Sequence, residues 1–230
     1  MHHGDGVQEA FIDTNRVCTL SFHQFDPEGN FFPGTGSVDE IGVKEGRHCA
    51  INVPLKKGLE NNTFSSLFQR VVDRTIAHYQ PTAIWMQCGA DSLQGDTIGG
   101  FNLSIEAHSG ALRHILKKNI PVVFSGGGGY HVPNVVRCWT YETMVICRAE
   151  EDNMLIPENS KYRKCFSNPD LLHLRGNVHG VTADFNSEDY CNLVLADVYR
   201  SISKINGSVG FLRRFEFDDS IVNDYYGSAK

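Results

Sequence analysis

The sequence predicts an α/β fold built around a mostly parallel sheet. Short apolar segments rich in β-forming residues alternate with longer segments in which apolar residues recur every three or four positions. Strand–helix alternation of this kind predicts parallel βαβ units with right-handed crossovers. The two later strands also lack polar–apolar alternation, which predicts a sheet covered on both faces.

The first elements are predicted strands at 16–22 and 49–55, which are both short apolar runs. Between them, residues 23–36 ("HQFDPEGNFFPGTG") contain too many Gly and Pro residues for a helix or a strand. A helix is predicted next, with Asn61, Asn62 or Thr63 as its cap. Its apolar face comprises Phe64, Leu67, Phe68, Val71, Val72, Ile76 and Tyr79.

The later elements continue the alternation. Residues 83–88 and 121–125 are predicted buried strands, and a helix capped by Ser104 lies between them. Helical patterns run from 134 to 147 and from 187 to 205, whereas the final stretch to Lys230 is expected to be loosely attached. The inward face of the Ser104 helix comprises Ile105, Ala111, Leu112, Ile115 and Leu116.

Composition narrows the class of protein. The 230 residues are 41% hydrophobic, enough for one domain with a sizeable core, and the net charge of −6 argues against direct nucleic-acid binding. The seven cysteines form no Cys-x-x-Cys pair, which favours a reducing compartment over a disulfide framework. No apolar run is long enough to predict a membrane span or membrane partner.

Parallel sheets bind ligands beyond the carboxyl ends of their strands. Two segments follow predicted strands directly, "GADSLQGD" with Asp91 and "GGGGY" with Tyr130. Asp91 either points into a crevice or braces its own turn, and position alone favours the second reading. The four glycines are either a tight turn or a backbone that approaches a ligand, and they lack the Lys-Ser/Thr of a phosphate-binding loop.

The opening "HHGDG" is a third candidate site. A His near a terminus is more often solvated, or part of a tag, than a ligand, although the Gly-Asp-Gly that follows weakens the tag interpretation. His2 and Asp91 together supply two donors, whereas a catalytic zinc usually takes three from the protein. The residues alone therefore predict a partial metal site.

Six segments together resemble the zinc-dependent histone deacetylases, and among them the class I type. They occur in the order of that family over roughly residues 2–147: "HHGDGVQEAF", "VCTLSFHQF", "FFPGTG", "QCGADSLQGD", "GGFNLSIEAHSG" and "GGGGYHVPNVVRCWTYET". The resemblance implies a three-layer α/β/α fold. Residues 1–150 would be the C-terminal part of the catalytic domain, and 151–230 the end of the domain with a divergent, loosely packed region.

The implied activity is hydrolysis of N6-acetyl-lysine to lysine and acetate with a zinc cofactor, and potassium as a second ion. The implied substrates are histone tails or other acetylated proteins, and the implied setting is chromatin regulation and transcriptional repression. Corepressor proteins are implied partners. The implied location is the nucleus, with the cytoplasm as a second place.

The resemblance also assigns roles to single residues. His2 and Asp91 match zinc ligands, and Tyr130 matches the catalytic tyrosine that donates to the oxyanion. His3 and Asp5 belong to the shell around the metal. The matches to the substrate tunnel are Phe32, Ile98 and Gly128, and those to two monovalent-cation sites are Phe11, Thr14, Val17, the His2 backbone, Ser21 and Phe22.

Departures from the family pattern carry their own expectations. The family's first zinc-binding Asp falls two residues before His2 and its tandem catalytic histidines fall further upstream, so we expect an N-terminally truncated fragment with little or no activity alone. An uncovered sheet edge would also make it poorly soluble. Thr97 and Pro133 stand where corepressor-bound members have Arg, so we expect no tight inositol phosphate binding, and Cys49 replaces a common aromatic residue.

Three interpretations stay open from sequence. The first is an incomplete copy of a true lysine deacetylase. The second is a catalytically inactive deacetylase-like binding or scaffold protein. The third, an unrelated metal hydrolase, is weaker because a different reaction would not need Tyr130.

Overall fold

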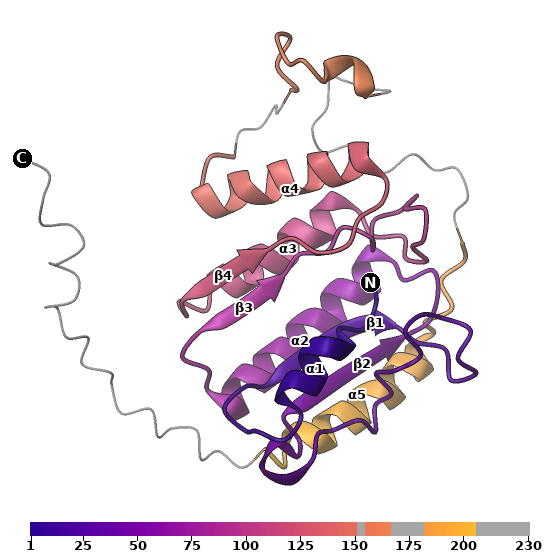
Figure 1. Ribbon diagram of the computed structural model, residues 1–230, viewed down its shortest axis with the longest axis vertical. Helices are drawn as coiled ribbons and strands as arrows, with labels where there is room; N and C mark the ends of the chain where they lie inside the picture. The colour runs from indigo at the N-terminus through magenta and orange to yellow at the C-terminus, as the bar shows by residue number, and fades with distance from the viewer. Residues whose placement is uncertain (151–154, 167–181, 206–230) are drawn as a thin grey trace, which may run out of the picture.

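A computed structural model describes residues 1–150, 155–166 and 182–205 (Figure 1). The strands form two parallel pairs, β1 (Thr19–Gln24) with β2 (Ala50–Leu55), and β3 (Ile84–Gln87) with β4 (Val122–Ser125). The predicted α/β class with parallel strands is confirmed. The described strands do not form one continuous sheet but two sheets of two strands each.

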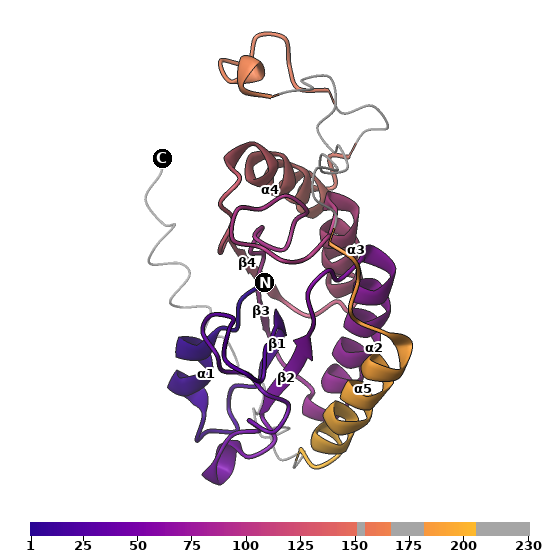
Figure 2. The same ribbon diagram turned by 90° about the vertical axis from the view of Figure 1, so that its right-hand side faces the viewer.

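The helices pack in layers around these strands. Figure 2 shows the helices α2 (Asn61–Tyr79), α3 (Ile105–Leu116) and α5 (Glu188–Ile202) on one side of the strands, and the short helix α1 (Asp5–Phe11) on the other side, next to β1. The helix α4 (Val132–Cys147) packs against α3. Two short 3-10 helices, Lys44–Gly46 and Arg163–Cys165, complete the described elements.

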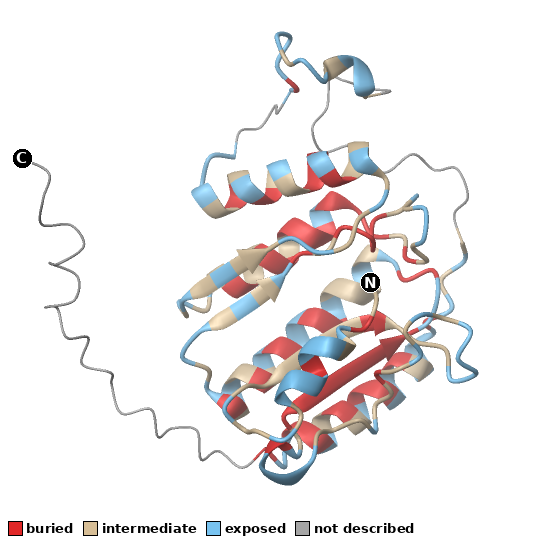
Figure 3. Cartoon of the chain, viewed as in Figure 1, coloured by how far each residue is buried: buried red, intermediate tan, exposed pale blue. Residues whose placement is uncertain are grey.

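The main core lies where β2 meets α2 and α5. Every residue of β2 is buried, and its side chains Val53 and Leu55 have no exposed surface (Figure 3). The side chain of Asn186 bonds both the backbone N–H and the C=O of Lys56, at 2.7 and 2.9 Å, and so docks the start of α5 against the end of β2. Burial of the apolar faces, at about 25 cal/mol per Å², is the main stabilising term here.

The expectation that both faces of the later strands are covered is wrong. Trp85 of β3 is 73% exposed and Val123 of β4 is 52% exposed. Half-buried and exposed residues alternate along β3, and the other residues of β4 are half-buried. The other face packs Ile84, Met86 and Val122 against the α2–α3 layer. An apolar run alone does not distinguish a strand buried on both faces from one whose second face is apolar but open.

The helix boundaries differ from the predicted ones in small ways. Glu60, rather than Asn61, Asn62 or Thr63, occupies the N-cap of α2. The Asn61 side chain instead pairs with Ser104, the N-cap of α3, through reciprocal bonds of 2.8 and 2.9 Å. Asn61 thus bonds the N-cap residue of the neighbouring helix α3 instead of capping its own helix α2.

Two other differences concern helix starts. The short helix α1 was not expected, because its sequence lies inside the candidate metal segment. The helix α4 begins at Val132, two residues before the predicted start, with Pro133 in its first turn, where Pro is well tolerated.

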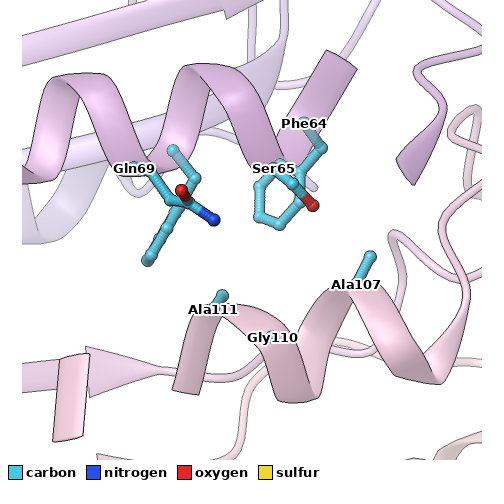
Figure 4. A pocket seen from close by; sticks show the side chains of 7 residues that line it. Phe64, Ser65, Gln69, Ala107, Gly110 and Ala111 are labelled. Atoms are coloured by element: carbon cyan, nitrogen blue, oxygen red, sulfur yellow. The ribbon is translucent and has the colours of Figure 1, made fainter. Parts of the chain in front are cut away.

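A shallow hollow lies between α2 and α3 (Figure 4). Phe64, Ser65 and Gln69 border it from α2, and the small residues Ala107, Gly110 and Ala111 border it from α3. None of the sequence-predicted site residues lines it. The hollow reflects small side chains at a helix–helix contact.

The described helices include none with the length and hydropathy that a membrane crossing requires. The predicted boundary between 1–150 and 151–230 stays a prediction. Residues 206–230, for which loose attachment was expected, lie outside the described part of the chain.

Candidate metal and catalytic site

His2 and Asp91, 89 residues apart in sequence, are in direct contact. The His2 Nδ1–H donates to Asp91 Oδ2 at 2.8 Å, and the Met1 α-amino group donates to Asp91 Oδ1, also at 2.8 Å. Asp91 is 4% exposed and follows β3, whereas His2 precedes α1. The structure therefore brings together the two side chains that the sequence paired as metal donors.

Asp91 is a buried carboxylate held in its charged form. Burial by itself raises the pKa of this carboxyl group, but the Met1 ammonium and the His2 imidazole outweigh burial and place its pKa below the ordinary value. The interpretation that Asp91 only braces its own turn is wrong, because its carboxylate bonds residues from a distant segment.

Two aromatic rings surround His2. Phe31 stacks on the imidazole with a centroid distance of 5.0 Å and an interplanar angle of 4°, and Phe32 meets it edge-on at 6.2 Å. Phe32 is itself 75% exposed, so it presents an apolar surface beside the His2–Asp91 pair. Sequence reasoning identified Phe32 but missed Phe31, because two adjacent aromatics in a loop do not reveal which one stacks.

His3 is buried and fully bonded behind His2. Its Nε2–H donates to Gln8 Oε1 at 3.1 Å, and its Nδ1 accepts the Thr35 hydroxyl at 2.8 Å. Gly36 is required beside it, because a Cβ there would overlap the rings of His3 and His23. Burial lowers the pKa of His23 to about 4, so this ring is neutral near pH 7.

The glycine turn approaches Asp91 closely. The Ala90 N–H donates to Gly128 O at 2.7 Å, and a Cβ on Gly128 would overlap the Asp91 carboxylate. This contact fits the tight turn that a crowded strand end requires, in which the missing side chain lets the backbone pass a charged group. The approach of this backbone to a ligand stays a prediction. The turn also carries Tyr130, whose side chain is half exposed.

Asp96 joins the loop after β3 to the Tyr130 segment. Its Oδ2 accepts the backbone N–H groups of Tyr130 at 2.7 Å and His131 at 3.2 Å, and its Oδ1 accepts the Ile98 N–H at 3.1 Å. No local sequence pattern indicates this role, because a Gly-Asp pair in a loop is common in turns.

A buried polar network lies behind Asp91. The Ser92 hydroxyl bonds His108 Nε2 at 2.7 Å, His108 Nδ1 bonds Glu142 Oε1 at 3.2 Å, and the Cys138 thiol donates to the same oxygen at 3.5 Å. Among the described residues, His108, Cys138 and Glu142 form the one group of three potential metal ligands within 4.8 Å of one another.

Hydrogen bonding accounts for this group without a metal. Burial and the adjacent Glu142 raise the pKa of the Cys138 thiol, which keeps it protonated and a donor, whereas a metal ligand is a thiolate. The network ties α3 and α4 to the residue after Asp91. None of its members was singled out from sequence, because they are far apart along the chain.

The remaining predicted residues lie in separate places. Phe11 ends α1, and Thr14 and Val17 follow in the loop before β1, while Ser21 and Phe22 belong to β1. Ser21 bonds His23 Nδ1 at 2.8 Å, and Asp5 accepts the Gly6 N–H in the first turn of α1. Cation binding by these residues stays a prediction.

Zinc sites are built from imidazole nitrogens, carboxylate oxygens and thiolates. His2 and Asp91 supply one nitrogen and one carboxylate, 2.8 Å apart at the carboxyl ends of parallel strands. The donor chemistry fits zinc, and this pair is one donor short of the three that catalytic zinc sites usually take from protein.

Comparison with known proteins identifies the family of this site. The family model described as "Histone deacetylase domain" matches residues 1–146. The chain is 48% identical over 174 residues to Histone deacetylase 6 of Arabidopsis thaliana, covering 76% of this chain and 36% of the relative. It is 44% identical over 205 residues to Histone deacetylase 9 of the same plant, covering 89% and 46%.

An animal relative gives the same result. Identity to Histone deacetylase HDAC1 of Drosophila melanogaster is 43% over 175 residues, or 76% of this chain and 32% of that protein. The chain belongs to the histone deacetylase family, a class of zinc-dependent hydrolases. It spans between about a third and a half of the length of these curated relatives.

Proposed function

We propose that this chain forms the C-terminal part of a lysine deacetylase site, which hydrolyses N6-acetyl-lysine to lysine and acetate. The observation that carries the proposal is the 2.8 Å contact between His2 Nδ1 and Asp91 Oδ2. Family membership supports the reaction class, and the turn that brings Gly128 against Asp91 also carries Tyr130.

Each residue has a defined task in this proposal. His2 and Asp91 hold a zinc ion, which when bound polarises the amide carbonyl and lowers the pKa of a water molecule. Tyr130 donates its hydroxyl proton in a hydrogen bond to the developing oxyanion. Phe32 packs along the aliphatic part of the lysine, and its exposed ring beside His2 supports that role.

We further propose that the 230-residue polypeptide alone has little or no turnover. His2 and Asp91 are two donors, and His3 does not serve as the general base because both of its ring nitrogens are engaged, with Thr35 and Gln8. Loss of a general base alone costs roughly 10²–10⁴ in rate. An incomplete metal shell would lower activity further.

Acetate release from an acetyl-lysine peptide tests this directly. The purified polypeptide with equimolar zinc should match its own Tyr130→Phe variant at background level. Robust turnover stoichiometric with zinc would overturn the proposed incompleteness. A chimera that places the upstream catalytic segment of Histone deacetylase 6 of Arabidopsis thaliana before His2 should gain activity. Tyr130→Phe in the chimera should then reduce kcat by roughly 10²–10³, the cost of one oxyanion donor.

A second candidate is a catalytically inactive deacetylase-like scaffold. The exposed Trp85 and Val123 on the β3–β4 face favour it, since exposed apolar surface is a feature of binding proteins. This candidate predicts co-purification with histone or corepressor complexes that Tyr130→Phe leaves unchanged. Complexes that require the intact acetyl-lysine site would instead support the enzyme.

The proposed partners and place in the cell follow from the family. We propose acetylated lysines of histones or other proteins as substrates, a nuclear location with a cytoplasmic fraction, and potassium as a second ion. Tight inositol phosphate binding is not proposed, because Thr97 and Pro133 carry no charge. Calorimetry with inositol hexakisphosphate tests the expected absence of tight binding. Fluorescence microscopy of the tagged chain tests the proposed nuclear location.

A further inference from the structure

We propose that Asp96 is a positioning residue, which fastens the catalytic Tyr130 segment to the loop that carries Ile98. The roles of Tyr130 as oxyanion donor and of Ile98 as tunnel rim rest on the proposed function. The restraint itself is a property of the fold. The Asp96 carboxylate thus holds Tyr130, the proposed oxyanion donor, and Ile98, the proposed rim residue, in one fixed arrangement.

The geometry is that of a bridging carboxylate. Oδ2 accepts the N–H of Tyr130 at 2.7 Å and of His131 at 3.2 Å, while Oδ1 accepts the N–H of Ile98 at 3.1 Å. The three amides belong to two segments that are more than 30 residues apart. Hydrogen bonds to a charged acceptor are about twice as strong as neutral ones, so this carboxylate is a substantial restraint.

Side-chain burial does not fix these two residues. Tyr130 and Ile98 are each 51% exposed, in contrast to the buried Asp91. Tyr130 also follows four glycines, which have no side chains to anchor the segment, and Gly129 has a φ of +140°. The position of Tyr130 therefore depends on polar contacts of the backbone at 130–131, and Asp96 accepts one hydrogen bond from each of these two residues.

The neighbouring contacts agree with this role. The Ala90 N–H bonds Gly128 O at 2.7 Å and fixes the turn at the Asp91 end, while Asp96 fixes it at the Tyr130 end. His131 is the N-cap of α4, so Asp96 also places a negative charge at the positive end of that helix dipole. Removing only the Asp96 end should free Tyr130 while leaving Asp91 in place.

The test uses the 230-residue chain without metal or substrate. Its tyrosines are labelled with 3-fluorotyrosine, and Tyr130→Phe assigns the Tyr130 fluorine resonance. In Asp96→Asn, the amide hydrogens of Tyr130 and His131 should exchange about tenfold faster, since a loss of 1.4 kcal/mol corresponds to that factor. The Tyr130 fluorine resonance should shift while the other tyrosine resonances stay unchanged.

Asp26→Asn is the matched control. Asp26 also accepts hydrogen bonds in an exposed turn, from the Glu28 N–H and the Asn30 side chain, each at 3.0 Å, but it contacts no catalytic segment. This variant should leave the Tyr130 resonance in place. Thr97→Ala, the uncharged neighbour of Asp96, should do the same.

Two outcomes overturn the inference. One is unchanged exchange and an unchanged Tyr130 resonance in Asp96→Asn. The other is a shift of all fluorine resonances with a fall in Tm, which would make Asp96 a support of the whole fold rather than of Tyr130. Neither outcome depends on deacetylation, so a failure of the proposed function is detected separately, by the acetate assay.

Discussion

Gly128 lies against Asp91 so closely that a Cβ on the glycine would stand 2.8 Å from the Asp91 carboxyl carbon. Two loops that follow different strands thus meet with only the Asp91 carboxylate between their backbones. This contact makes the Asp91 carboxylate and the turn that carries Tyr130 sterically dependent on each other.

Gly128→Ala should therefore destabilise the chain by about 1–3 kcal/mol, the usual cost of overpacking, and should displace the Asp91 carboxylate. Urea unfolding measures the loss of stability. A loss of zinc affinity would report the displacement of the Asp91 carboxylate. Gly110→Ala is the matched control, since nothing lies within 4 Å of a Cβ at that position inside α3. It should stabilise by about 0.5–1 kcal/mol, and equal effects of the two substitutions would contradict the steric argument.

His108→Ala should remove the centre of the buried network behind Asp91. Ser92 and Glu142 would each lose a partner, and leaving a buried polar group unsatisfied costs about 1–3 kcal/mol. Thermal unfolding provides the measurement. Glu106→Ala, at an exposed position on the same helix, should change stability by no more than about 0.5 kcal/mol. A His108→Ala variant as stable as the unaltered chain would show that the network contributes nothing.

Glu40→Gln should reduce stability more near neutral pH than in acid. Burial alone would raise the pKa of Glu40, but the backbone N–H groups of Ser37 and Gly36, together with Gln8, hold it below the ordinary 4.5. The folded pKa is thus the lower one, so the stabilisation is complete above the unfolded pKa and disappears as pH falls through the folded pKa.

The expected difference between Glu40→Gln and the unaltered chain is about 1 kcal/mol at pH 7 and smaller at pH 3. Urea unfolding across this pH range checks it. Glu45→Gln, an exposed carboxylate in the first 3-10 helix, should show no such dependence. A Glu40 effect that is the same at both pH values would rule out the charged hydrogen bonds as its cause.

Trp85→Thr should improve solubility without weakening the core. The Trp85 ring is largely exposed on the open β3–β4 face, and Thr retains high β-propensity. Light scattering during concentration should show less aggregation, with Tm changed by only a few degrees. Leu193→Thr, at another exposed apolar position but on α5, should have a smaller effect. If the two variants behave alike, aggregation does not begin at the β3–β4 face.

The local pattern of the sequence was enough for most of the fold. Apolar periodicity located α2, α3, α4 and α5, and the short apolar runs located the strands, because each pattern reflects which side of an element is buried. Apolar periodicity does not show whether another element covers the second face of a strand. For that reason the open side of Trp85 and Val123 was missed.

The site was predictable to the extent that it depends on residue type and on strand ends. His2, Asp91 and Gly128 were identified in this way, and the structure brings them together. Asp96 and His108 were missed because one decisive partner of each, Tyr130 and Glu142 respectively, is 34 residues away in the chain. Hydrogen-bond pairing over such separations depends on packing, which no local pattern specifies.

The way Asn186 docks α5 against β2 has a consequence for the order of events during synthesis. The central strand of the core lies between β1 and a helix that follows it by more than 130 residues, and Asn186 bonds the backbone of Lys56 directly. A nascent chain that has reached α4 can pack α2 against β2, but the part of the β2 surface that α5 covers is still exposed. Completion of the core must therefore wait until residues 188–202 leave the ribosome, and until then that strand is a target for chaperones.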